Sequence, residues 1–122
     1  MKVYQITDNI YHATIFVIPE YDDKKLIRYF RKTFGHDYKP DNTIDGMHYA
    51  LTNGETGVVA HYLIFKAFTN SSDGISLLFH EIYHLVCSIM REVGMVYSED
   101  SEEAFSYYIQ CLTKKILERL IK

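Results

Sequence analysis

The sequence predicts an α+β domain in which a small antiparallel sheet packs against three helices. Two stretches, 3–18 and 47–68, are rich in the β-branched and aromatic residues that strands favour. Three others, 22–35, 72–94 and 102–120, repeat apolar residues at helical spacing, as helices do when one face packs on a core. Because the order is strands, helix, hairpin, helix, helix, we expect an antiparallel sheet with the helices to one side.

The first half of the chain is expected to hold two strands and a helix. Asp8-Asn9 is a turn signal inside the extended stretch 3–18, and Pro19 ends the second strand. Asp22-Asp23 opens the helix, since negative charge is favoured at a helix N-terminus. Gly35 is the expected stop, because glycine adopts the left-handed conformation common after the last helical residue.

A loop and a hairpin are expected next. The stretch 35–46 is rich in Asp, Asn, Pro and Gly and predicts a loop. Asn53-Gly54 lies between the apolar runs 47–51 and 58–68, and Asn-Gly between such runs indicates a tight hairpin turn with positive φ. The second run is continuously apolar, so we expect it to lie inside the sheet.

Two long helices complete the prediction. Ser72 or Asp73 is expected to cap a helix that ends near Gly94. The last helix is expected from Glu102 to about Leu120, because its early acids and late bases suit the helix dipole.

Size and composition predict one domain, 1–122. The 122 residues are 48% hydrophobic and 24% charged, which excludes a disordered chain. The net charge of −3 and the lack of a basic cluster argue against nucleic-acid binding. No apolar run predicts a membrane span or a signal peptide. With two cysteines and no export signal, we expect a cytoplasmic protein with free thiols; no particular oligomeric state is indicated.

The third predicted helix carries the sequence His80-Glu81-Ile82-Tyr83-His84. Histidines four residues apart lie on one helix face, about 5–6 Å apart, so that both imidazoles can reach one Zn²⁺ ion. Glu81 lies about 100° around the helix from His80, beside such an ion, where a general base belongs. Burying these polar groups among apolar residues costs free energy unless something pairs them, and a metal would do so.

Eighteen residues after His84, the last helix begins with Glu103-Ala104-Phe105-Ser106-Tyr107. This arrangement of His-Glu-x-x-His followed by a glutamate resembles the gluzincin clan of zinc metallopeptidases, over roughly residues 73–111. The resemblance implies that His80, His84 and Glu103 are zinc ligands and that Glu81 is the general base. It also implies a zincin-like fold in which a hairpin edge strand, within 47–67, holds a peptide or protein substrate.

Alternatives remain for several of these residues. If Asp100 is the helix N-cap, Glu103 closes a capping box and Glu102 becomes the ligand instead. Only one of the two glutamates can face the site, and the resemblance favours Glu103. Tyr107 shares a face with Glu103 and is a candidate for contacting the substrate, or else a buried structural tyrosine.

Three further side chains belong near the predicted site. Cys87 lies on the same helix face as the histidine pair. It is either a soft metal ligand or a small core residue. His48 and His61 lie in the two hairpin strands, where one of them stabilises an oxyanion if they pair near the cleft. The ordinary alternative for both is a cross-strand polar position.

The functional expectation is a zinc-dependent metallopeptidase, in a minimal form of the kind carried by phages and mobile elements. The alternative from a different class is a non-catalytic zinc-binding protein with a structural or interaction role in a phage or mobile element. A closed four-ligand site that recruits Cys87 would mark the second function, because structural zinc leaves no open position. A third possibility is a metal-free domain whose histidine pair belongs to the core.

Overall fold

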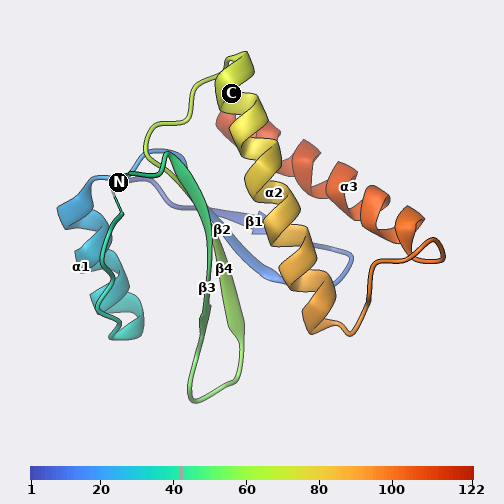
Figure 1. The fold of residues 1–122 in the computed structure, drawn as a ribbon. Coiled ribbons are helices and arrows are strands. Elements are labelled where there is room, and N and C mark those ends of the chain that lie inside the picture. Colours follow the sequence, from blue (N-terminus) through green and yellow to red (C-terminus); the bar gives the residue numbers. More distant parts are fainter. Residues whose placement is uncertain (42) are drawn as a thin grey trace.

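A computed structural model describes residues 1–41 and 43–122; Asn42, assigned above to the loop 35–46, lies outside them. The described chain folds into an α+β arrangement of a four-stranded sheet and three helices (Figure 1). In chain order the elements are β1 (Tyr4–Thr7), β2 (Thr14–Ile18), α1 (Asp23–Phe34), β3 (Gly46–Thr52), β4 (Val59–Phe65), α2 (Ser72–Glu92) and α3 (Glu102–Leu120). None of these helices is both long enough and apolar enough to cross a bilayer.

The sheet is mixed, so the expectation of a wholly antiparallel sheet is wrong. Its strand order is β1-β2-β4-β3. The β1–β2 and β3–β4 pairs are antiparallel, whereas β2 and β4 run parallel from the Thr14–Ala60 pair to the Ile18–Ile64 pair. The cause is the connection: α1 and β3 lie between β2 and β4 in sequence, and a parallel pair needs such a long crossover.

Helices cover both faces of the sheet, and the expectation of helices on one side is also wrong (Figure 1). α1 packs Leu26 and Phe30 against Tyr62 and Ile64 on one face. α2 and α3 cover the opposite face. Because successive side chains of a strand point to opposite faces, β4 is buried on both sides, which explains its continuous apolar sequence and its interior position.

The β3–β4 turn is longer than Asn-Gly predicts. The strands pair antiparallel up to the Thr52–Val59 pair, so residues 53–58 connect them. Positive φ falls at Gly57 (73°) and not at Asn53 or Gly54. The Asn53 side chain instead accepts hydrogen bonds from the backbone N–H groups of Glu55 and Thr56, at 2.9 and 3.1 Å. Asn53 therefore stabilises the loop through side-chain hydrogen bonds and not through a backbone conformation of positive φ.

The helix ends follow local capping chemistry. α1 begins after Asp22, which accepts a hydrogen bond from the Lys25 N–H, and ends at Gly35 with φ 64°, as predicted. The N-cap of α2 is Ser71, so the expectation of Ser72 or Asp73 is wrong by one or two residues. The α2 start packs closely, since a Cβ on Gly74 would lie 1.9 Å from the Thr69 carbonyl oxygen.

α3 begins at Glu102, as predicted, but its N-cap is Ser101, whose side chain makes no capping hydrogen bond. Asp100 is therefore not the N-cap, and it does not form the expected capping box with Glu103. α3 buries Phe105, Tyr108 and Leu112 against the core shared with α2.

Asp8 ties α3 to the β1–β2 turn. Its carboxylate is 5% exposed and accepts hydrogen bonds from the backbone N–H groups of Ile10, Tyr11 and Ala13 and from the Tyr108 hydroxyl at 2.7 Å. Burial alone would raise the pKa of Asp8, but these hydrogen bonds outweigh burial and lower the pKa below its ordinary value. The turn is thus fixed by an ionised, buried carboxylate.

We expect Tyr108→Phe to lower the free energy of unfolding by about 1.5–3 kcal/mol, the usual cost of losing a hydrogen bond to a charged group. Urea unfolding followed by circular dichroism measures this. Tyr107→Phe, which alters an exposed neighbour on the same helix, is the matched control and should change stability by less than about 0.5 kcal/mol. Equal stability of the two variants would contradict the anchoring role of Asp8.

The Asp8 contribution should depend on pH. Because the pKa of Asp8 is lowered in the folded state, its stabilisation is complete at neutral pH, declines below the ordinary aspartate pKa of about 3.9 and is lost below the folded pKa. The difference in unfolding free energy between the parent chain and Asp8→Asn should therefore shrink between about pH 6 and pH 3. A difference that stays constant or grows on acidification would refute this assignment.

Candidate metal centre

Helix α2 brings His80, Glu81 and His84 together. Apolar residues of α2, including Leu78, Ile82 and Leu85, are buried in the core, which leaves both histidines at the surface. The His80 and His84 Nε2 atoms lie 3.2 Å apart. Potential ligand atoms of His80, Glu81 and His84 all lie within 4.8 Å of one another. The structure therefore groups the three motif residues as the spacing predicts.

The separation of the two Nε2 atoms fits a shared metal ion. Nitrogen ligands at about 2.0–2.1 Å from a tetrahedral ion lie about 3.3 Å from each other, close to the 3.2 Å found here. Solvent exposure of both rings leaves an ion access to water. The donor set suits zinc, which binds neutral imidazole nitrogen.

Glu81 lies beside the histidine pair but is buried. It is 5% exposed, and its Oε1 lies 3.8 Å from His80 Nε2. Burial raises the pKa of Glu81, while the nearby His80 and His84 and the His48 backbone N–H reduce this rise. A carboxyl group of raised pKa is a stronger proton acceptor than an exposed glutamate, as a general base beside a potential metal site needs to be.

A groove between α2 and the edge strand β3 holds these groups. It has a volume of about 510 Å³, and its walls are residues of β3 and of the outer side of α2: Gly46, Met47, His48, Ala50, Glu81, His84, Cys87, Ser88 and Arg91. Since β3 is the last strand of the described sheet, its outer backbone groups pair with no other strand. The groove therefore offers both side-chain and main-chain hydrogen-bonding groups.

His48, which lines this groove, pairs with the buried His61. His48 Nε2 lies 2.9 Å from His61 Nδ1, and the rings are stacked. His61 Nε2 lies 2.6 Å from Glu92 Oε1 at the end of α2, although the ring N–H is not aligned with that oxygen as in a regular hydrogen bond. The sequence suggested the His48–His61 pairing only conditionally, and Glu92 was missed because nothing in its local sequence marks it.

The predicted residues of α3 lie apart from the histidine pair. Glu103 and Glu102 are exposed on the first turn of α3, and neither belongs to the group formed by His80, Glu81 and His84. Tyr107 is 58% exposed, and the nearby Cys111 thiol raises its pKa. In this arrangement the chain offers two histidine ligands and a base, and the role of Glu103 remains a prediction.

Cys87 is half-buried and lines the groove one helical turn beyond His84. Its thiol lies near the Tyr83 hydroxyl on the same helix and raises the pKa of Tyr83. The structure thus places Cys87 next to the candidate site, outside the group of three potential ligands.

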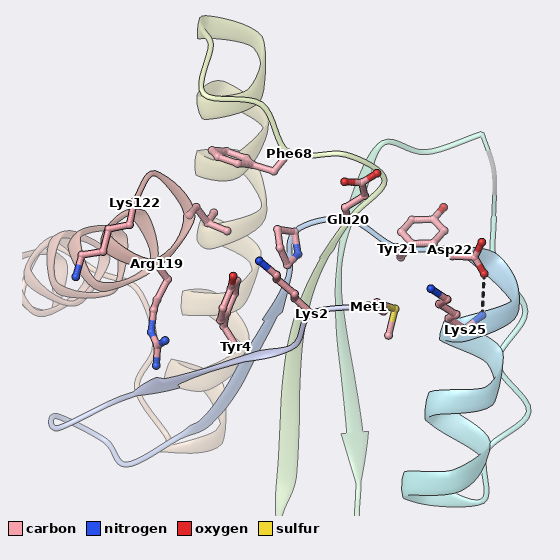
Figure 2. Close-up of a pocket in the computed structure, with 12 residues that line it drawn as sticks. Met1, Lys2, Tyr4, Glu20, Tyr21, Asp22, Lys25, Phe68, Arg119 and Lys122 are labelled. Carbon is pink, nitrogen blue, oxygen red and sulfur yellow. Dashed lines mark hydrogen bonds between the residues drawn. The ribbon is translucent and has the colours of Figure 1, made fainter.

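A larger cavity, of about 630 Å³, lies away from the motif, between the start of α1 and the end of α3 (Figure 2). Its charges are mixed, since Lys2 and Lys122 face the same space as Glu20 and Asp22. The Arg119 guanidinium lies over the Tyr4 ring, 5.5 Å from its centre. Because no histidine or cysteine lines this cavity, the smaller groove beside α2 is the better candidate for metal chemistry.

No protein-family model, curated protein or solved structure significantly matches the chain. The function is therefore argued from the residues of the groove.

We expect the purified 122-residue chain to bind about one zinc ion, and His84→Ala to lose it, because one imidazole alone cannot hold the ion. Equilibrium dialysis with elemental analysis measures the stoichiometry. Tyr83→Phe, one residue earlier on the same helix, is the control and should keep zinc. Zinc bound equally well by His84→Ala would exclude the histidine pair as the metal site.

The same measurement on Glu103→Gln tests the proposed third ligand. A loss of zinc affinity of about tenfold or more would support Glu103 as a ligand. Unchanged zinc affinity would show that Glu103 is not a zinc ligand.

Proposed function

We propose that this protein is a zinc-dependent hydrolase of peptide bonds, with His80 and His84 holding the ion and Glu81 acting as general base. The observation that carries the proposal is the pair of Nε2 atoms 3.2 Å apart, with the buried Glu81 carboxyl beside them in the groove. The resemblance to gluzincins in the stretch 73–111 supports it, as does the exposure of both rings.

The ion, when bound, supplies Lewis acidity that polarises a carbonyl group and lowers the pKa of water. The contribution of the chain is to place a proton acceptor beside it. The Glu81 carboxyl takes a proton from the attacking water and returns it to the leaving amine. Burial, which raises the pKa of Glu81, makes the carboxylate a better acceptor than an exposed glutamate.

The geometry of β3 supports a peptide as the substrate class. An extended peptide can add to the exposed edge of a sheet through main-chain hydrogen bonds. β3 is such an edge strand, and it forms one wall of the groove that contains Glu81 and His84. A peptide lying along β3 would pass directly by the proposed base.

The position of Cys87 favours a second candidate function, a non-catalytic metal-binding protein. Cys87 lines the same groove as His84, and a thiolate from this position would close the site. A closed site has no open position for water, so it would bind zinc without hydrolysing peptides. Cys87→Ser should then weaken zinc binding, whereas the hydrolase proposal expects it to leave binding and turnover intact.

Glu81→Gln should keep zinc and lower peptide hydrolysis by about 10²–10⁴-fold, the usual contribution of a general base. The amide keeps the size of the side chain but cannot accept the proton. A library of quenched fluorescent peptides measures turnover, with zinc content measured on the same samples. Hydrolysis at the parent rate by zinc-loaded Glu81→Gln would refute the mechanism, and no hydrolysis by any zinc-loaded form would refute the proposed activity.

A further inference from the structure

A chain of polar side chains crosses the otherwise apolar interface between the sheet and α2. It runs from Glu92, the last residue of α2, to His61 on β4 and then to His48 on β3. His61 is wholly buried, and it lies on the sheet face that packs against α2, beside Leu63 and Phe65. A buried polar group here costs free energy unless its partners are in place, so both contacts of His61 matter for the fold.

The contacts define where the protons lie. Burial lowers the pKa of His61 to about 4 and, together with nearby His61 and His84, lowers that of His48 to about 4, so both rings are neutral at pH 7. His61 Nε2 lies 2.6 Å from Glu92 Oε1, and an ionised carboxylate can only accept, so this contact favours a proton on Nε2, although the ring N–H is not aligned with that oxygen. His61 Nδ1 then accepts, and His48 Nε2 is the donor across the 2.9 Å contact.

The same strand position contacts the proposed base. The backbone N–H of His48 lies near the Glu81 carboxylate, in the groove that both residues line, and it lowers the pKa of Glu81. β3 is therefore joined to α2 at two levels, directly at Glu81 and through His61 at Glu92. These two levels are eleven residues apart, about 16 Å along the helix. Both contacts meet β3 at His48, one through its backbone N–H and one through its side chain, so together they hold this residue of β3 against α2.

We propose that the Glu92–His61–His48 chain is the positioning element of the candidate site. It holds the edge strand β3 against α2 so that the His48 N–H stays on the Glu81 carboxylate and orients it beside the histidine pair. The effect of this chain of residues on catalysis rests on the function proposed above. Its effect on the position of β3 is independent of that function, because the contacts involve no metal.

The first test is nuclear magnetic resonance on the metal-free 122-residue chain. Long-range ¹H–¹⁵N spectra should show His48 and His61 as neutral rings protonated at Nε2. In His61→Phe, which keeps a ring but removes both contacts, hydrogen exchange of the His48 amide should become about tenfold faster or more. Protonation at Nδ1 of either ring, or an unchanged His48 exchange rate in a folded His61→Phe, would overturn the proposal.

Two further variants separate positioning from general stability. Glu92→Leu acts from a partly exposed position at the helix end, so it tests the chain even if His61→Phe does not fold, and Glu92→Gln should restore slow exchange because its oxygen can still accept. Tyr62→Phe is the matched control: it removes the 2.7 Å bond to Tyr29 on the other face of the same strand. Tyr62→Phe should leave the His48 amide unchanged; equal acceleration in Tyr62→Phe and Glu92→Leu would overturn the proposal.

The catalytic consequence is read on the zinc-loaded protein. Glu92→Leu should lower kcat by about 10–100-fold while KM and zinc content stay the same, since only the orientation of Glu81 changes. A changed KM with unchanged kcat would contradict a positioning role. If the parent chain shows no hydrolysis, the proposed function fails, yet the exchange and tautomer measurements still decide whether the chain of residues positions β3.

Discussion

The contact between the Glu81 carboxylate and the edge strand β3 is the constraint on which the candidate site depends. A glutamate on the buried side of a helix needs a partner, and the backbone N–H of His48 supplies it. β3 is held by its pairing with β4, and this contact lies in the groove between β3 and α2. It reduces the rise in the pKa of Glu81 that burial causes, while His80 and His84 face solvent.

The layered fold makes this contact possible. β4 lies inside the sheet with both faces buried, so β3 is left at the edge, next to α2. α1 covers the far face and does not compete with α2 for the groove side (Figure 1). α3 supports α2 from the core side, and the Asp8–Tyr108 bond attaches α3 to the β1–β2 turn. The histidine pair therefore lies on a helix held by two separate sets of contacts.

The sequence predicted the local structure better than the assembly. The bounds of α1 and α3 followed from Asp22, Gly35 and the charges of the last helix, because capping and dipole effects act within one turn. The His80–Glu81–His84 group followed from helical spacing alone. The parallel β2–β4 pair and the helices on both faces did not, because they depend on how the α1 crossover returns to the sheet. The Glu92–His61 contact joins residues 31 positions apart, and no local pattern encodes it.

The proposed function depends on one metal ion bound by the two Nε2 atoms of the α2 histidines. X-ray absorption at the zinc edge, on the zinc-loaded 122-residue chain, measures this binding directly. We expect at least two imidazole ligands at about 2.0–2.1 Å, and no such zinc environment in His84→Ala, which should lose the ion. A zinc environment without imidazole scattering, or one identical in the parent chain and His84→Ala, would contradict it.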